Sequence, residues 1–378
     1  MTPFPARPDR RAVMAGGAAL IAAPLPARAA DPRAYEDQLD LSFSRSGAPA
    51  LAGMIVGRSG ASWIGVRGVR RLGVADAVTR DDRWHLGSNT KAMTAALWAR
   101  AVQAGKARWD MRVAEVFTDL TLHERLATAT MDDLMRHRAG LLDAPLMEQG
   151  WLRTSRTDTR SMAEQRAAVA AQLLAAAPPG RPGSFAYANV NYIIAGAALE
   201  RIHGRPWEAQ MATDLFAPLG ITTGGFGAPV DPAPWGHRAA NGVSAPVAPG
   251  PLADNPAALG PAGTAHMTLA DYARFIAVFL DAGKGWLTQA SLARLATPPE
   301  GPPPAYAYGW GTMRAPWAGR DRGVGPLLTH DGSNTFWYLS AAVAPERGLA
   351  IVTASNDAER GAEATGDLMT RLIRAATT

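Results

Sequence analysis

The sequence has 378 residues, of which 47% are hydrophobic and 19% charged, enough apolar material for one large domain or two closely packed ones. It contains no cysteine, which excludes a lipid-anchored cysteine, a thiol nucleophile and cysteine-ligated metal sites. The formal net charge is +5, but four arginines and one aspartate within residues 1–29 carry +3 of it. The remaining +2 argues against a surface for nucleic acid.

The first residues have the pattern of an export signal. The pair Arg10-Arg11 precedes a short apolar stretch over 13–23, and an Ala-Arg-Ala site ends at residue 29. The apolar stretch is too short to span a bilayer. The arginine pair favours twin-arginine export, with an ordinary secretory signal as the alternative. We therefore expect residues 1–29 to be removed and a periplasmic or secreted mature protein without an integral membrane segment.

Beyond the signal, strands are predicted at both ends of the chain and helices between them. A helix over 31–41 is followed by two strands within 51–69 that are joined by a glycine-bounded turn. Four helices are then expected, over 90–104, 163–177, 192–203 and 269–282. The last part contains three strand-like stretches and a closing amphipathic helix, over 306–314, 335–345, 348–356 and 362–376.

Two proline- and glycine-rich connectors interrupt the middle of the chain, at 178–183 and 229–261. The second is long for a structureless loop, so we expect it to be functional or to cover another part of the fold.

This order predicts an α+β fold of the α/β sandwich type. One antiparallel sheet would be built from both termini, helices would flank it, and a mainly helical region would be inserted between its strands. The corresponding boundaries are 30–85 and 295–378 for the sheet region and 86–294 for the helical region, all within one catalytic domain.

The segment Gly-Ser-Asn-Thr-Lys at the start of the helix over 90–104 holds Ser88 and Lys91. Three residues apart on a helix, the two side chains lie on one face. The residues after Lys91 are apolar or small, so the lysine is predicted to be buried, and a buried ammonium needs a partner or a role. Beside a serine hydroxyl, an amine accepts the proton or orients the group that does. Alone, the pattern also fits a helix-capping serine with a surface lysine.

Two further stretches carry a resemblance to a known family. Tyr187 and Asn189 lie just before an apolar helix, and His330 and Gly332 lie on a predicted strand. With Ser88 and Lys91 they reproduce, in order, the motifs Ser-x-x-Lys, Tyr-x-Asn and Lys/His-x-Gly. The chain thus resembles the penicillin-recognising serine hydrolases, in particular the class C β-lactamase branch with its D-Ala-D-Ala carboxypeptidases and β-lactamase-like carboxylesterases.

Connecting segments extend the resemblance over most of the mature chain. Asp-Asp-Leu-Met-Arg-His-Arg-Ala-Gly-Leu-Leu-Asp, over 132–143, is similar to the family's Leu-Leu-x-His-x-Ser-Gly-Leu stretch, with Ala139 where serine is usual. The resemblance implies the β-lactamase/transpeptidase-like fold, without cofactor or metal.

The resemblance also implies site roles. Ser88 would be the nucleophile of an acyl-enzyme, Lys91 would help to receive its proton, and Tyr187 would be the general base or a proton relay. Asn189 would hold Lys91 and contact a substrate amide. The backbone N–H groups of Ser88 and Ser333 would form the oxyanion hole.

His330 and Gly332, on a predicted strand, would form the wall of the site opposite Ser88 and Tyr187. Gly332 leaves room for substrate, and His330 would bind a carboxylate or relay a proton. Histidine replaces the lysine of efficient β-lactamases, which argues against strong antibiotic hydrolysis. The other histidines are interpreted as structural, with His137 in a buried hydrogen bond near a turn, and no histidine pair has the i, i+4 spacing of a helical metal site.

The sequence thus predicts a serine hydrolase that cleaves a small ester, amide or peptidoglycan-type substrate. Esterase, D-amino-acid peptidase and weak β-lactamase share the same machinery, and the sequence does not choose among them. The alternative is a non-catalytic peptidoglycan- or penicillin-binding sensor of the same fold. The oligomeric state is not predicted.

Overall fold

A computed structural model describes residues 31–240 and 243–378 of the chain. The predicted export signal, residues 1–29, therefore lies outside the described residues. Among the residues that are described, no helix combines the length and the apolar character needed to cross a membrane.

The main sheet has six strands in the order β2-β1-β11-β10-β9-β8, and every neighbouring pair is antiparallel. Its strands are β1 (Ala50–Gly57), β2 (Gly60–Gly68), β8 (Gly311–Ala315), β9 (Gly325–Ser333), β10 (Tyr338–Ala344) and β11 (Leu349–Ser355). β1 pairs with β11 in a register that sets Ile55 opposite Ile351. The sheet is therefore built from both ends of the described chain, as predicted.

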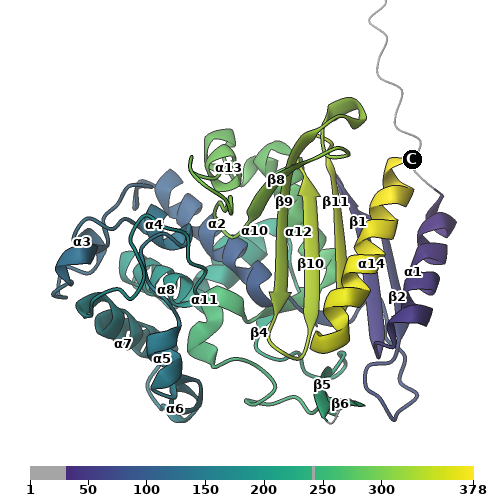
Figure 1. The fold of residues 1–378 in the computed structure, drawn as a ribbon, viewed down its shortest axis with the longest axis horizontal. Coiled ribbons are helices and arrows are strands. Elements are labelled where there is room, and N and C mark those ends of the chain that lie inside the picture. The colour runs from purple at the N-terminus through teal and green to yellow at the C-terminus, as the bar shows by residue number, and fades with distance from the viewer. Residues whose placement is uncertain (1–30, 241–242) are drawn as a thin grey trace, which may run out of the picture.

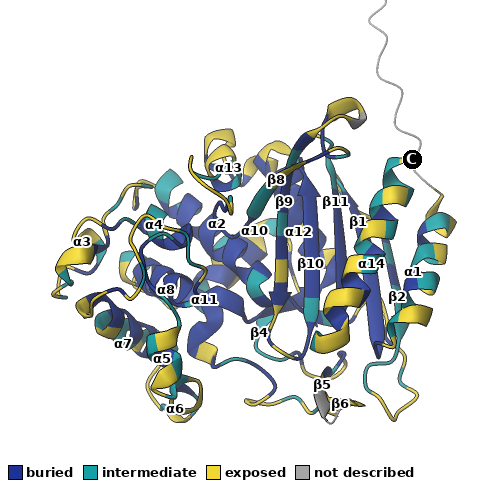
Figure 2. Ribbon diagram, viewed as in Figure 1, coloured by how far each residue is buried: buried dark blue, intermediate teal, exposed yellow. Residues whose placement is uncertain are grey.

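Helices cover both faces of this sheet (Figure 1). α1 (Pro32–Ser46) and α14 (Ala358–Thr377) pack on one face, and α12 (Leu269–Leu280) lies on the other. Side chains of β1 alternate between the two cores: Leu51 and Ile55 join α1 and α14, whereas Met54 joins the larger core. Because both faces are covered, β1 is buried along almost its whole length and its sequence is continuously apolar (Figure 2).

The region between β2 and β8 is mainly helical. Its longer α-helices are α2 (Thr90–Gln103), α7 (Met162–Ala175), α8 (Val190–His203), α12 and α13 (Gln289–Ala296). Shorter helices are α3 (Val113–Val116), α4 (Met131–Met135), α5 (Ala144–Glu148), α6 (Trp151–Thr157), α9 (Trp207–Gln210), α10 (Ala217–Leu219) and α11 (Gly260–Gly263), with one π-helical turn at Met211–Phe216. The predicted helices over 163–177, 192–203 and 269–282 are confirmed with ends within two residues.

Two small sheets complete the fold. β3 (Arg83–His85), β7 (Ala265–Thr268) and β4 (Gly225–Phe226) form one, and β5 (Gly236–Ala240) with β6 (Val243–Val247) forms the other. The connector over 229–261 thus contains a hairpin, which the composition did not indicate. His237 of the hairpin contacts the backbone carbonyl of Asn356, just before α14, and accepts the backbone N–H of Leu72 from the segment between β2 and β3.

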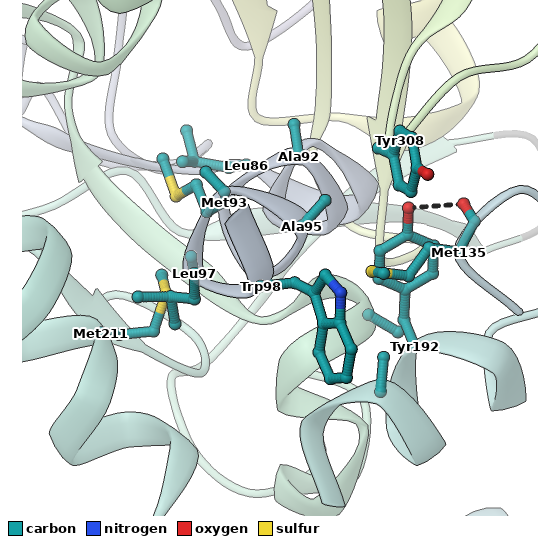
Figure 3. Packing of buried hydrophobic residues seen from close by; sticks show 14 of the residues in the cluster. Leu86, Ala92, Met93, Ala95, Leu97, Trp98, Met135, Tyr192, Met211 and Tyr308 are labelled. Carbon is teal, nitrogen blue, oxygen red and sulfur yellow. Dashed lines mark hydrogen bonds between the residues drawn. The ribbon is translucent and has the colours of Figure 1, made fainter. Parts of the chain in front are cut away.

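α2 is buried almost all round, as predicted, and forms the centre of the larger core. Figure 3 shows Met93, Leu97 and Trp98 of this helix among side chains of several other elements. Beside it, the Tyr192 hydroxyl donates to the backbone carbonyl of Met135 at 2.8 Å. Lys91 on this helix is therefore shielded from solvent by the surrounding core.

Two elements lie at the predicted region boundaries. β3 ends at His85 but pairs with β7 of the helical region, and α13 runs across the 294/295 boundary. The division into 30–85 with 295–378, and 86–294, stays a prediction.

Candidate active site

Ser88 lies in a tight turn that opens directly into α2. A 3-10 turn over Gly87–Asn89 precedes the helix, and the Thr90 hydroxyl donates to the Gly87 carbonyl at 2.7 Å. The Asn89 amide donates to the carbonyls of Leu86 and of Leu339 on β10. These bonds fix the turn against both its own chain and the main sheet.

Lys91 is fully buried and its ammonium nitrogen has three oxygen neighbours. Nζ lies 3.0 Å from the Ser88 hydroxyl, 2.8 Å from Oδ1 of Asn189 and 2.7 Å from the backbone carbonyl of Ala262. Burial lowers the pKa of Lys91 from 10.5 to about 7, although the Asp143 carboxylate opposes this shift. The lysine is therefore divided between its charged and neutral forms near neutral pH.

Tyr187 and Asn189 approach from the start of α8. The amide of Asn189 donates to Asp143 at 2.9 Å, and the other oxygen of Asp143 accepts the backbone N–H of Val190. The Lys91 ammonium lies over the Tyr187 ring, 4.8 Å from the ring centre. Although the Tyr187 side chain is 42% exposed, desolvation raises the pKa of its phenol above the usual 10, so the phenol keeps its proton at neutral pH.

The loop that carries Tyr187 is fixed by His137. The His137 carbonyl accepts the N–H of Ala186, and its ring nitrogen Nδ1 accepts the N–H of Ala188 and contacts the amide of Asn191. Its ring centre lies 4.5 Å from that of Tyr187. The predicted buried hydrogen bond of His137 is thus confirmed, and it lies directly beneath the site.

The end of β9 forms the opposite wall. A Cβ atom on Gly332 would lie 2.1 Å from the Leu86 carbonyl oxygen and 3.0 Å from the backbone nitrogen of Ser88. A Cβ on Gly87 would lie 2.5 Å from the backbone nitrogen of Ser333. Only glycines allow this approach, and it brings the backbone N–H groups of Ser88 and Ser333 into the same neighbourhood.

His330 is buried on the same strand and makes two contacts. Its Nδ1 lies 2.8 Å from the backbone carbonyl of Asp331, and its Nε2 lies 3.4 Å from the Tyr306 hydroxyl. Desolvation, and to a lesser degree the charge of Lys91, lower the pKa of His330 to about 3. The imidazole is therefore neutral near pH 7.

The structure brings together all seven residues that the sequence suggested. Hydrogen bonds join Ser88, Lys91 and Asn189, and the Lys91 ammonium lies over the Tyr187 ring. His330, Gly332 and Ser333 lie on the adjacent strand. Sequence reasoning missed Asp143 and Tyr306, because a carboxylate and a phenol far away in the chain carried no spacing signal. Trp310 and Trp337 are buried at 0% and 1% exposure and belong to the core.

No group of three or more histidine, cysteine, aspartate or glutamate side chains suited to a metal ion occurs within the part of the chain that the structure describes.

Comparisons with known proteins agree with this geometry. The family model described as Beta-lactamase matches residues 42–376. Penicillin-binding protein 4 of Amycolatopsis lactamdurans is 28% identical over 304 residues, which span 76% of each chain. Unguisins hydrolase ungD' of Aspergillus campestris is 27% identical over 74% of this chain, and the match spans 53% of that longer protein. The chain therefore belongs to the beta-lactamase family.

Solved structures support the same fold. The octameric penicillin-binding protein homologue from Pyrococcus abyssi superposes with a TM-score of 0.74 at 18% identity, covering 92% of this chain and 78% of that one. A D-stereospecific amidohydrolase from Streptomyces superposes with a TM-score of 0.68 at 21% identity, covering 90% of this chain and 98% of that one. The predicted fold class, a β-lactamase/transpeptidase-like α+β fold, is confirmed.

Proposed function

We propose that the protein is a serine hydrolase that cleaves an uncharged ester or amide through an acyl-enzyme on Ser88. The observation that carries this proposal is the contact of 3.0 Å between the Ser88 hydroxyl and a buried Lys91 whose pKa is lowered to about 7. An exposed lysine is almost fully charged at neutral pH and accepts no proton, whereas this one is a competent base.

The hydrogen bonds of Lys91 suit a neutral amine. As an ammonium, Lys91 donates to Ser88, Asn189 and Ala262. As a neutral amine, it would keep its two N–H bonds to Asn189 and Ala262 and would accept the Ser88 hydroxyl proton with its lone pair. Lys91 would take the serine proton as Ser88 attacks the substrate carbonyl. The two backbone N–H groups of Ser88 and Ser333 would stabilise the resulting oxyanion.

Tyr187 would act as a proton relay in this scheme. Its pKa is raised, so a phenolate base is disfavoured at neutral pH. The phenol would instead pass its proton to the leaving group and receive in its place the serine proton held by Lys91, so that both side chains return to their starting state. Water would then hydrolyse the acyl-enzyme, with Lys91 and Tyr187 serving the second step in reverse.

The substrate is proposed to lack a free carboxylate next to His330. The imidazole is buried and neutral, and both of its nitrogens have partners in the structure. It supplies no positive charge to a carboxylate of the kind that a lysine would bind. An ester or a peptide amide without a charged terminus fits this wall better than a penicillin. Two of the similar proteins are named as an amidohydrolase and a hydrolase, which is compatible with an amide substrate.

The test is labelling with a fluorophosphonate and, separately, with labelled penicillin, followed by mass mapping. Label on Ser88 from the fluorophosphonate but little from penicillin is expected. Efficient labelling by both would instead indicate a cell-wall-type acyl site. No label from either would favour the non-catalytic sensor. Ser88→Ala should abolish turnover of p-nitrophenyl butyrate, and Ser59→Ala in the exposed β1–β2 turn is the matched control.

We also propose that residues 1–29 direct export to the periplasm or the medium, on the sequence pattern given above. N-terminal sequencing of the exported protein should find an end near residue 30, and active protein that begins at Met1 would contradict this.

A further inference from the structure

A chain of buried polar side chains joins the residue before the nucleophile to the turn that follows β9. The backbone N–H of Gly87 donates to Nδ1 of His85 at 3.1 Å. Nε2 of His85 lies 2.9 Å from one carboxylate oxygen of Asp254, and the other oxygen accepts the amide of Asn334 at 2.8 Å. We call these three side chains, His85, Asp254 and Asn334, the bracket.

Each bond in the bracket has a defined direction. Because Nδ1 of His85 accepts from Gly87, the proton of the neutral ring is on Nε2, which donates to Asp254. The two side chains are 0% and 5% exposed, so water does not replace these bonds. The ring of His85 also stacks on Trp337 with centroids 5.6 Å apart. A buried chain of satisfied polar groups of this kind resists displacement.

At its other end the bracket fixes the turn between β9 and β10. The side-chain oxygen Oδ1 of Asn334 accepts the backbone N–H groups of Phe336 and Trp337, both at 3.2 Å. Between Asn334 and Phe336, Thr335 has a φ of +75°, which is unfavourable for a β-branched residue. Its N–H donates to the Ser333 hydroxyl at 3.0 Å. The turn holds this conformation because Asn334 is itself tied to Asp254.

The two ends of the bracket meet at the nucleophile. Gly87 has a φ of +52°, and its Cα lies so close to Ser333 that a Cβ would be 2.5 Å from the Ser333 nitrogen. One end thus holds the residue before Ser88, and the other holds the residue after Ser333.

We propose that the bracket positions the two oxyanion-hole N–H groups relative to each other, which makes His85, Asp254 and Asn334 positioning residues for acylation. This inference rests on the proposed function of Ser88. Two donors help the transition state only if both point at the same oxygen, and loss of one such donor lowers kcat by about 10²–10³-fold. A displacement of about 1 Å costs up to about 10²-fold.

Three variants cut the bracket at different bonds. His85→Asn keeps an acceptor for Gly87 but does not reach Asp254, whereas His85→Gln reaches Asp254 but leaves Gly87 unbonded. The Asp254 carboxylate accepts from His85, from Asn334 and from the backbone N–H of Asn255, so Asp254→Asn sets an amide N–H against at least one of these donors. Each should lower kcat/KM for p-nitrophenyl butyrate about ten- to a hundredfold. The Ki of a competitive inhibitor that binds rapidly should change little.

The decisive readout is the rate ratio between a p-nitrophenyl ester and its thiono analogue, in which sulfur replaces the carbonyl oxygen. Sulfur is larger and a weaker acceptor, so a well-ordered oxyanion hole discriminates against it. The ratio should fall at least about fivefold in all three variants as donor geometry loosens. A merely destabilised protein would keep the ratio.

Rescue and a matched control complete the test. Combining Asp254→Asn with Asn334→Asp restores a donor–acceptor pair between the two positions and should recover part of the ratio. Glu200→Gln removes a buried carboxylate that accepts from Arg166 and from the Trp207 N–H. It lies eleven residues along α8 from Asn189, roughly 16 Å, and should leave the ratio unchanged.

Two outcomes separate this proposal from the one it rests on. If wild-type Ser88 takes no fluorophosphonate label, the proposed function fails and the bracket proposal falls with it. If Ser88 is labelled but every folded bracket variant keeps the wild-type ratio, or changes it no more than Glu200→Gln, the bracket proposal alone is overturned.

Discussion

Lys91 should make the stability of the fold depend on pH in a way that one substitution removes. In the folded protein its pKa is about 7, whereas an exposed lysine in the unfolded chain titrates near 10.5. Between these two values the unfolded chain holds one more proton than the folded protein, so stability rises with pH across that window. Below about pH 7 the full cost of burying the charge is present, and above 10.5 it is absent.

The size of the effect follows from the two pKa values. Their difference corresponds to about 5 kcal/mol over the whole window, since each pH unit is worth about 1.4 kcal/mol. Between pH 7 and pH 9.5, about 3 kcal/mol of this should appear. Lys91→Met removes the titrating group, so the free energy of unfolding of the wild type minus that of the variant should rise by about this amount over the same range.

The measurement is urea unfolding followed by circular dichroism at pH 6.5, 7, 8, 9 and 9.5 for both proteins. Other titrating groups, including the buried tyrosines, are common to both and cancel in the difference. The sequence has only three lysines, and Lys106 is exposed, so Lys106→Met is the matched control and should give a flat difference. Parallel curves for the wild type and Lys91→Met would refute the depressed pKa and, with it, the role of Lys91 as base.

Three further outcomes are expected. Lys91→Ala and Tyr187→Phe should each lower kcat severely, and the double variant should be little worse than the poorer single; additive losses in log rate would mean independent roles. Gly332→Ala inserts a Cβ 2.1 Å from a carbonyl oxygen and should lower ester turnover about 10²-fold, whereas Gly57→Ala, with open space around it, should not. His330→Lys should raise the kcat/KM ratio of nitrocefin over p-nitrophenyl butyrate about ten- to a hundredfold; an unchanged ratio at every pH would place His330 away from the substrate.

The parts of the fold that the sequence predicted are those with local signals. β1 and β2 were predicted from apolar runs and a glycine-bounded turn, and α2 from an apolar stretch after Lys91. The hairpin of β5 and β6 was missed, because its strands are only five residues long, contain glycine and proline, and are held by contacts with α14 and the residue before Asp357 rather than by a pattern of their own.

The site residues also fall into those with a local sequence signal, which were predicted, and those without one, which were missed. Ser88 and Lys91 are three residues apart on a helix, so their spacing indicated their proximity. Tyr187 was assigned through the resemblance of its Tyr-x-Asn motif to that of a known family. Asp143 and Asp254 had neither signal, because each acts on residues that are distant in the chain and near only after folding. The charge state of His330 was equally beyond sequence reasoning, since it depends on how completely the ring is desolvated.

The antiparallel pairing of β1 with β11 affects the order in which the protein folds during its synthesis. These strands are joined in register although Leu51 and its partner Ser355 lie about three hundred residues apart, and the turn around Ser88 is completed by Gly332 and Leu339. Contacts of such separation form late and slowly, after most of the loop-closure entropy has been lost. A nascent chain that still lacks β9, β10 and β11 therefore has no assembled nucleophile, so reactivity would appear only after these strands have been synthesised.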